Sequence, residues 1–495
     1  MSADTLIKQS PAMKNGYETE LNDWIKLEKA AIELISIVGT LWFEKSIELI
    51  LFHNELTDRS SSELLNLHLY AQNVVKQPIT ILDTLQIAKE INKLDLSPSR
   101  IDIGKLASEW ILEKEKYGKD SAKFASDKLK TFIGKDKLVL KPKDVVLYGF
   151  GRIGRIAARE LTAQAGKGEQ LRLRAIVTRN YSDADLVKRA DLLRTDSVHG
   201  PFPGTVVEDF KNQALIINGH TVKMIAASSP DKVDYTSYGI NDALLIDNTG
   251  VDRTREGLSK HLISKGISKV LLTAPGKGDI PNIVFGVNHD KFDVATEKIF
   301  SAASCTTNGI IPVLKVIEEK LNIKNGHLET IHSYTNDQNL LDNYHKKYRR
   351  GRSAPLNMVI TETGASGAVG KVLPSLKGKL TANSVRVPTP NVSLAILHLE
   401  ISKKTTKDEV NELIRHAALH SELVEQIQYC YSNELVSTDV IGNPCPSVFD
   451  SQATIVAESG HHIVLYVWYD NEYGYTKQVF RLAKHLAEVI RLRYY

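Results

Sequence analysis

Cys305 and His332 are the residues of this 495-residue chain whose types and surroundings best fit nucleophilic catalysis. Cys305 stands in the small polar stretch SAASCTTNG, directly before an amphipathic run that predicts a helix. The positive end of the helix dipole favours a thiolate, the reactive form of the thiol. His332 follows a predicted strand in TIHSYTNDQ and can serve as a general base and acid beside a thiol. The pair therefore predicts covalent catalysis through cysteine.

Each of these residues also has an ordinary structural interpretation. An isolated cysteine is usually a buried, inert hydrophobic side chain, and the chain contains 15 histidines, of which a single one is usually structural. The other two cysteines, Cys430 and Cys445, lack a polar setting before a helix. Three scattered cysteines are too few for a disulfide framework or a thiolate metal site, so we expect no metal and a reducing cytoplasm.

A glycine-rich loop predicts a dinucleotide site. Gly149, Gly151 and Gly154 form the pattern G-x-G-x-x-G between the apolar run DVVLYGFG and a helical run. The first glycine allows a tight turn, the second lets the backbone approach a pyrophosphate, and the third permits close packing of strand and helix. An ordinary glycine turn is the alternative interpretation. The flanking strand and helix favour dinucleotide binding over it.

The end of the second predicted strand bears on the choice between NAD and NADP. This strand, LRLRAIVTRN, ends in Thr178 and Arg179, where NAD-specific proteins carry an acidic residue that holds the adenosine ribose. No carboxylate is present to repel the 2′-phosphate of NADP, and Arg179 could pair with that phosphate. A solvated arginine fits the position equally well. We therefore expect NAD or NADP to be used, with NADP accepted.

The elements that must position these residues fall into three regions, in keeping with the length of the chain. Residues from about 20 to 130 are poor in glycine and proline and carry apolar residues at helical spacing, which predicts an all-α extension over 1–143. Alternating short apolar and helical runs predict a Rossmann-type doubly wound parallel sheet over 144–304, completed by a C-terminal helix in 471–495. Longer strand-like runs over 305–470 predict an α+β catalytic domain with a mixed or antiparallel sheet.

Composition and charge exclude several functional classes. A formal net charge of +4 is mild for this length, and no segment combines basic and aromatic residues as nucleic-acid-binding proteins do. The opening MSADTLIKQS lacks the basic and apolar parts of an export signal, and charges interrupt the apolar stretch from Ala30 to Phe52. We expect neither export nor membrane insertion, and small anionic substrates fit the charge.

Six segments give a more specific signal when they are taken together. They are YGFGRIGR, DSVHGPFPG, SAASCTTN, HSYTNDQ, RVPTPNVS and WYDNEYGY, in this order along the chain. They resemble the successive signature segments of glyceraldehyde-3-phosphate dehydrogenases, and the resemblance covers residue 144 to the C-terminus. It implies that D-glyceraldehyde 3-phosphate and inorganic phosphate become 1,3-bisphosphoglycerate through a thioester on Cys305, with His332 as the base.

The resemblance also implies positions for the phosphates and the cofactor. The attacking inorganic phosphate would be bound by Ser304, Thr306, Thr363 and Gly364. The residues expected around the C3 phosphate of the substrate are Thr335, Asp337 and Arg386, with Arg352 facing the phosphate pocket. The dinucleotide would be lined by Arg152, Ile153 and Thr249, and Asn471 would hold the nicotinamide amide. Outside the resemblance, a capped or hydrogen-bonded surface group is the favoured interpretation of every one of these polar residues except Arg386.

The loop between Gln338 and Ala354 contains LLDNYHKKYRRGR, which resembles the corresponding loop of photosynthetic, NADP-using members. Those members place a serine near the position of Tyr344 to contact the 2′-phosphate, and here Tyr344 or Asn343 would have to substitute. A solvated basic loop is the alternative interpretation. In this family the loop crosses a subunit interface, so the resemblance implies a homotetramer.

Two further functions remain as alternatives. An erythrose-4-phosphate dehydrogenase would hydrolyse the thioester instead of transferring it to phosphate. A catalytically idle dinucleotide-binding or regulatory protein would depend on the N-terminal extension, which the family resemblance leaves unaccounted for. The direction of flux, glycolysis or gluconeogenesis, also stays open at this point.

Overall fold

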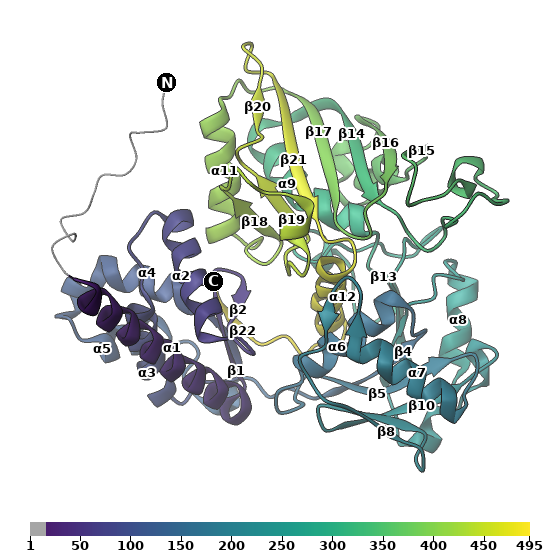
Figure 1. Ribbon diagram of the computed structural model, residues 1–495, viewed down its shortest axis with the longest axis horizontal. Coiled ribbons are helices and arrows are strands. Elements are labelled where there is room, and N and C mark those ends of the chain that lie inside the picture. Colours follow the sequence, from purple (N-terminus) through teal and green to yellow (C-terminus); the bar gives the residue numbers. More distant parts are fainter. Residues whose placement is uncertain (1–15) are drawn as a thin grey trace. The chain divides into compact units, whose positions relative to one another are not determined.

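The computed structural model describes residues 16–495, which form two compact units (Figure 1). The first unit contains the chain up to Val139 together with Arg491–Tyr494, and the second contains Leu140–Ile490. No helix of the described residues is both long enough and apolar enough to cross a lipid bilayer.

The first unit combines helices with a small sheet. Its helices are α1 (Tyr17–Lys45), α2 (Ser61–Val75), α3 (Ile81–Lys93), α4 (Ile103–Glu113) and α5 (Ser121–Lys128). Its strands, in the spatial order β2-β1-β3-β22, are β1 (Ile47–Leu51), β2 (Asn54–Glu55), β3 (Ser99–Asp102) and β22 (Leu492–Tyr494). The helices agree with the sequence analysis, which did not foresee the sheet. Periodicity cannot separate a short apolar strand such as β1 from the last turn of the helix before it.

The second unit begins with a doubly wound sheet, as the sequence predicted. Its spatial order is β13-β12-β11-β4-β5-β10-β9-β8, in which β13 to β10 are parallel and β9 and β8 are antiparallel. The strands are β4 (Lys143–Tyr148), β5 (Leu171–Thr178), β8 (Val206–Asp209), β9 (Ala214–Ile217), β10 (His220–Ala226), β11 (Ala243–Asp247), β12 (Ile267–Leu272) and β13 (Ile299–Ser301).

Four helices accompany this sheet, and a short hairpin follows α7. They are α6 (Arg152–Ala163), α7 (Asp183–Arg194), α8 (Arg255–Ile263) and α12 (Tyr473–Leu486), with the hairpin strands β6 (Thr195–Asp196) and β7 (Gly200–Pro201). Apolar residues of α12, among them Val479 and Leu486, share a buried core with Val145 and Leu147 of β4. The expected C-terminal helix is therefore present but ends at Leu486, because the last residues of the chain form β22 in the first unit.

A second sheet carries the catalytic region, and it is mixed, as the sequence predicted. Its spatial order is β15-β16-β14-β17-β21-β19-β18, with β20 paired to β21. The strands are β14 (Ile323–Ser333), β15 (Val359–Thr361), β16 (Leu380–Val387), β17 (Ser393–Ile401), β18 (Ile427–Cys430), β19 (Ser447–Asp450), β20 (Ile455–Val456) and β21 (His462–Tyr469). The helices are α9 (Cys305–Leu321), α10 (Ala365–Val372) and α11 (Lys407–His420).

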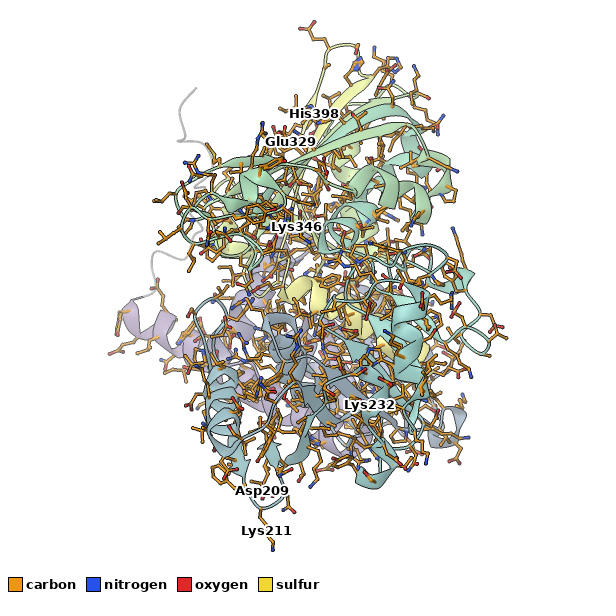
Figure 2. All side chains as sticks on the ribbon, turned by 90° about the vertical axis from the view of Figure 1, so that its right-hand side faces the viewer. Asp209, Lys211, Lys232, Glu329, Lys346 and His398 are labelled. Atoms are coloured by element: carbon orange, nitrogen blue, oxygen red, sulfur yellow. The ribbon has the colours of Figure 1, made fainter. Side chains whose placement is uncertain are left out.

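The two faces of the second sheet differ in character. Alternate residues of β17 and β21 are buried, and they form one core with the apolar side of α9. Polar residues such as Glu329 of β14 and His398 of β17 stand on the other face, where His398 is exposed (Figure 2). This alternation is typical of a sheet covered by helices on one side.

Candidate active site

The structure brings Cys305 and His332 together. Cys305 is the first residue of α9, and Ser304 caps that helix by accepting a 3.0 Å hydrogen bond from the N–H of Thr307. His332 lies near the end of β14, and its Nε2 atom is 3.6 Å from the Sγ atom of Cys305. The side chain of His332 is buried, whereas Cys305 is partly accessible. This is the geometry expected of a thiol and its base.

The second ring nitrogen of His332 has two polar neighbours. Nδ1 lies 2.8 Å from the carbonyl oxygen of Ser333 and 2.9 Å from Nη1 of Arg386. A carbonyl only accepts and a guanidinium only donates, so Nδ1 cannot serve both neighbours. With the proton on Nδ1, the ring donates to the Ser333 carbonyl, which also accepts from Arg386 at 2.9 Å. Nε2 then presents its lone pair to the thiol.

Burial and charge determine the protonation of the pair. Burial, followed by the positive charge of Arg386, lowers the pKa of His332 to about 3, so the ring is neutral at physiological pH. Burial raises the pKa of the Cys305 thiol, although Arg386 and hydrogen bonds from Thr306 act in the opposite direction. The sequence analysis expected the helix dipole to favour a thiolate. In the structure burial is the largest influence, and the resting pair is a neutral thiol beside a neutral imidazole.

A cavity of about 640 Å³ surrounds this pair. Candidate residues from the sequence analysis that line it are Arg152, Ile153, Ser304, Thr335, Asp337, Arg386 and Asn471. Arg386 has a nitrogen 3.4 Å from the hydroxyl oxygen of Thr335, which is itself hydrogen-bonded to Asp337. Arg350 forms an ion pair with Asp337, and sequence reasoning did not single it out for this role. Arg386 thus places positive charge at one end of the cavity, and Arg350 neutralises Asp337 beside it.

Four expected phosphate residues do not line this cavity. The hydroxyl of Thr306 is buried and lies 3.0 Å from the hydroxyl of Tyr469. Thr363 and Gly364 stand at the N-terminus of α10, where the Thr363 hydroxyl accepts a hydrogen bond from the N–H of Ala365. Arg352 is exposed and pairs with Asp342 at 2.8 Å.

Asn471 is held by two serines that the sequence analysis missed. Its Oδ1 atom accepts hydrogen bonds of 2.8 Å from Ser333 and 3.0 Å from Ser393, both buried hydroxyls. With Oδ1 engaged, the amide N–H₂ group is the part of the side chain left for the cavity. Ser333 and Ser393 lie in the segments HSYTNDQ and RVPTPNVS, but their role was missed because each acts on a residue distant in sequence.

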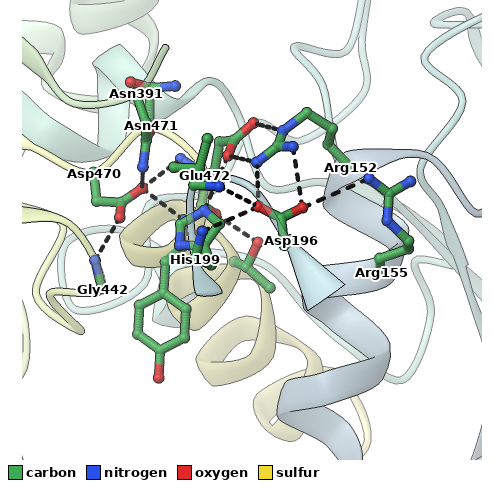
Figure 3. A network of polar contacts seen from close by, with 12 residues as sticks. Arg152, Arg155, Asp196, His199, Asn391, Gly442, Asp470, Asn471 and Glu472 are labelled. Carbon is green, nitrogen blue, oxygen red and sulfur yellow. Dashed lines mark hydrogen bonds and ion pairs between the residues drawn. The ribbon is translucent and has the colours of Figure 1, made fainter. Parts of the chain in front are cut away.

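A charged network connects the glycine loop to the segment that carries Asn471 (Figure 3). Both carboxylate oxygens of Glu472 bind the guanidinium of Arg152, the residue that follows Gly151. Arg152 also binds Asp196 at 3.1 and 3.2 Å, and Nε2 of His199 lies 3.0 Å from Glu472. Arg152 lowers the pKa of Glu472 against the opposing effect of burial. A bidentate arginine pair of this kind fixes orientation as well as distance.

The glycine loop has the geometry that a dinucleotide requires. Gly149 has a φ of +99°, and a Cβ atom on Gly154 would lie 2.3 Å from the carbonyl oxygen of Gly149. A Cβ atom on Gly151 would meet open space, and Gly151 leaves the N-terminus of α6 without a side-chain cap. The N–H groups there are free to bind a pyrophosphate. These features fit a nicotinamide dinucleotide.

A second cavity of about 410 Å³ lies beside this loop. Its lining includes the expected residues Gly149, Gly151, Thr178, Arg179 and Thr249. It also includes Arg189 of α7, which sequence reasoning missed because a charged residue on a helix surface carries no signal of its own. The Asp247 carboxylate in the same lining is engaged by the N–H and hydroxyl of Thr249 and by His261.

Fold and site together define a dinucleotide-binding oxidoreductase with a cysteine and histidine pair at its centre. Residues 143–255 match the family described as glyceraldehyde 3-phosphate dehydrogenase, NAD binding domain, and residues 304–471 match the C-terminal domain of the same enzyme. The chain therefore belongs to the glyceraldehyde-3-phosphate dehydrogenase family. The resemblance of the six sequence segments is confirmed.

Relatives extend this result to the first unit. A glyceraldehyde-3-phosphate dehydrogenase-like protein of Pseudomonas aeruginosa is 48% identical over 459 residues, which cover 92% of this chain and 98% of that protein. Glyceraldehyde-3-phosphate dehydrogenase of Priestia megaterium is 41% identical over 68% of this chain and 96% of its own length. The chloroplastic glyceraldehyde-3-phosphate dehydrogenase A of Zea mays is 43% identical over 68% of this chain and 81% of its own length. The Pseudomonas match is too long for the second unit alone, so it includes much of the first.

Proposed function

We propose that the protein is a phosphorylating glyceraldehyde-3-phosphate dehydrogenase, which converts D-glyceraldehyde 3-phosphate, phosphate and NAD(P)⁺ to 1,3-bisphosphoglycerate and NAD(P)H. The observation that carries this proposal is the 3.6 Å approach of His332 Nε2 to Cys305 Sγ in a cavity that Arg386 and Asn471 also line. A thiol, a base, a cationic end and an oriented amide are the groups that this reaction requires.

The first step is addition of sulfur to the aldehyde carbon. Nε2 of His332 accepts the thiol proton as the carbon–sulfur bond forms, and passes it to the former carbonyl oxygen. The substrate phosphate beside Arg386 offsets the charge that lowers the pKa of His332, so substrate binding makes this histidine a stronger base. The site is therefore weakly basic when empty and becomes more basic when it is loaded.

Oxidation and phosphate transfer follow on the same groups. His332 takes back the hydroxyl proton of the hemithioacetal, and a thioester on Cys305 remains. A bound nicotinamide dinucleotide supplies the hydride acceptor, which no side chain can provide. Asn471, fixed through Oδ1, orients the nicotinamide amide with its N–H₂ group. Phosphate held beside Ser304 then attacks the thioester carbon, and the Cys305 sulfur leaves as the acyl phosphate forms.

For the cofactor we propose use of both NAD and NADP. Thr178, Arg179 and Arg189 line the cavity beside the glycine loop, and the two arginines offer donors for a 2′-phosphate. Thr178 is too short to hold the ribose hydroxyls as a carboxylate would. Substitution of Thr178 by aspartate should shift the ratio of kcat/KM values toward NAD, and an unchanged ratio would refute this assignment.

We propose a homotetramer in a reducing cytoplasm, acting in glycolysis or gluconeogenesis. The segment from 334 to 358 exposes large apolar side chains, among them Tyr344 at 85%, Tyr348 at 91% and Leu356 at 79%. Exposed apolar side chains in one segment are typical of a protein interface. The three cysteines are free thiols, which agrees with a reducing compartment.

The decisive experiment measures NAD(P) reduction by the purified chain with glyceraldehyde 3-phosphate, with and without inorganic phosphate. We expect phosphate-dependent reduction that Cys305→Ser abolishes. Phosphate-independent turnover with erythrose 4-phosphate would favour the hydrolytic relative. Absence of reduction with both aldehydes, together with retained dinucleotide binding, would identify an idle regulatory protein.

A further inference from the structure

Residues 16–26, at the start of α1, have no packing partner among the described residues of their own unit. Every residue from 16 to 26 is exposed, and the buried residues of the helix begin only at Ala30. Large apolar side chains stand on this overhang, including Tyr17 at 77% exposure and Trp24 at 46%. A helical segment of this length is marginally stable in water when nothing packs against it. We therefore expect another surface to pack against this overhang, residues 16–26.

The exposed apolar residues of α1 form one stripe. At 100° per residue, the members of the stripe fall within about a 100° arc of the helix surface. The exposed members are Tyr17, Leu21, Trp24, Ile25, Ile32 and Phe43, the partly buried members are Ile35 and Gly39, and Glu28 lies among them. The buried residues Leu34, Val38 and Leu41 lie outside this arc, whereas the buried Trp42 lies within it. The stripe thus extends along the whole helix, from the overhang onto the packed half.

Four pairs of positions in the stripe are symmetric about Ala30, whereas the position symmetric to Trp24 is Ser36, outside the stripe. Tyr17 and Phe43 are equally far from this residue, as are Leu21 and Gly39, Ile25 and Ile35, and Glu28 and Ile32. When two copies of α1 lie antiparallel across a two-fold axis at Ala30, each member of a pair meets the other member on the second helix. Aromatic then faces aromatic, and isoleucine faces isoleucine. Such an isologous contact is the usual form of a two-fold interface.

Gly39 supplies an independent observation. Glycine in a helix interior is less favourable than alanine. A Cβ atom at this position would meet nothing within 4 Å, so nothing in its own unit requires a glycine there. A glycine on an exposed helix face allows another helix to approach closely, and the symmetric pairing places Leu21 of the second copy over it. Because Gly39 and Leu21 are both residues of α1, each copy offers the glycine and also the leucine that covers the glycine of the other copy.

The charges along the helix agree with pairing between two copies. Glu28 and Lys29 form no ion pair within residues 16–495, and the antiparallel arrangement places Glu28 of one copy about one helical turn from Lys29 of the other. The overhang carries Glu18, Glu20 and Asp23 against Lys26, an acidic balance that disfavours an anionic lipid surface.

We propose that α1 pairs antiparallel with α1 of a second copy of this chain, with the two-fold axis at Ala30 and Leu21 seated on Gly39 of the partner helix. The contact links subunits through the N-terminal unit. It is separate from the exposed segment 334–358 to which the homotetramer was assigned, so its failure would leave the proposed function untouched.

Disulfide trapping tests the arrangement in the full chain carrying Cys305→Ser. Tyr17 and Phe43 are about 39 Å apart on one helix, so cysteines there cannot join within a chain. We expect Tyr17→Cys/Phe43→Cys to form covalent dimers under mild oxidation, whereas each single variant stays monomeric on a denaturing gel. Co-expression of the two single variants with different tags should give a mixed dimer.

The controls separate antiparallel pairing from other contacts. A dimer of the Tyr17→Cys single variant would indicate a parallel pair, and absence of dimer in the double variant would overturn the proposal altogether. Gly39→Leu, for which the unit itself has room, should lower the yield of trapped dimer at least tenfold. Unchanged trapping by this variant would contradict the close approach at Gly39. Retained dehydrogenase activity in the Gly39→Leu chain with native Cys305 would show that the second unit is folded.

Discussion

The hydroxyl of Ser333 donates a 2.8 Å hydrogen bond to Oδ1 of Asn471, although 138 positions separate the two residues. Ser333 follows His332 directly, and its carbonyl oxygen lies 2.8 Å from the Nδ1 atom of that histidine. One residue thus orients the candidate base through its backbone and the candidate nicotinamide ligand through its side chain. The two halves of the site are coupled at Ser333.

Removal of both hydroxyls that hold Asn471 should impair hydride transfer. In Ser333→Ala/Ser393→Ala the amide loses two hydrogen bonds worth about 1 kcal/mol each, so we expect about a tenfold to thirtyfold loss in kcat/KM for the cofactor. The stereospecificity of hydride transfer, measured with deuterated cofactor, should also fall. Thr330→Val removes a buried hydroxyl from the same strand and is the matched control. Equal losses in both variants would contradict a positioning role.

The neutral imidazole of His332 should make the protein sensitive to acid. Its folded-state pKa of about 3 lies below the ordinary value of 6.5, so the unfolded chain binds this proton first and stability falls as pH drops through 6.5 toward 3. Between pH 7 and pH 5 the titration of His332 should lower the free energy of unfolding by about 2 kcal/mol. In His332→Gln this pH-dependent loss should be absent. Urea unfolding at both pH values measures it. His398→Gln, which removes an exposed imidazole, is the control.

Arg189 should contribute to NADP use. A charge-assisted hydrogen bond to a 2′-phosphate is worth about 1.5–3 kcal/mol, so Arg189→Gln should lower kcat/KM for NADP by about tenfold or more while NAD changes little. Steady-state kinetics with both cofactors give the ratio. Lys188→Gln removes a neighbouring positive charge that does not line the cavity and should leave the ratio unchanged. An equal effect of both variants would indicate a long-range electrostatic effect of positive charge instead of a direct contact between Arg189 and the 2′-phosphate.

The ion pair between Arg152 and Glu472 should support both stability and cofactor binding. Glu472→Gln leaves the Arg152 guanidinium with Asp196 as its carboxylate partner. We expect the free energy of unfolding to fall by about 2–3 kcal/mol. This is less than for a fully buried pair, because one quarter of the Arg152 side chain is exposed. The KM for the cofactor should rise because Arg152 adjoins the pyrophosphate loop. A double-mutant cycle with Arg152→Met measures the coupling, and a value near zero would contradict it.

Deletion of residues 492–495 should destabilise the first unit selectively. It removes β22 from the edge of β3, together with the 2.6 Å hydrogen bond from Tyr494 to Glu109 and the ring contact between Tyr494 and Phe132. Limited proteolysis should then cleave within residues 16–139 at least tenfold faster, while dehydrogenase activity persists. Deletion of Tyr495 alone keeps the strand and is the control. If both deletion variants were cleaved at the same rate, β22 would not be needed for the stability of the first unit.

Much of the second unit could be predicted because its signals are local. The glycines at 149 and 154 are required by a positive φ and by a 2.3 Å approach within one short loop, so their spacing alone indicated the dinucleotide site. The alternation of apolar and helical runs likewise predicted the doubly wound sheet. The chemistry of Cys305 and His332 was also inferred from residue types and from the elements that flank them.

The sequence by itself determined what depends on neighbours in the chain: the turn, the helix start at Cys305, the order of strands and helices, and the family to which the six segments belong. Only the tertiary structure decided what depends on contacts between distant residues. It brought Ser333 and Ser393 within hydrogen-bond distance of Asn471 and Arg189 into the lining of the cofactor cavity. It also made burial the largest influence on the pKa of the Cys305 thiol. The last residues of the chain form β22, which pairs with β3 in the sheet of the first unit. Local periodicity carries no trace of such pairings, because a hydrogen bond, a buried charge or a strand register is set by whichever side chains the fold brings together.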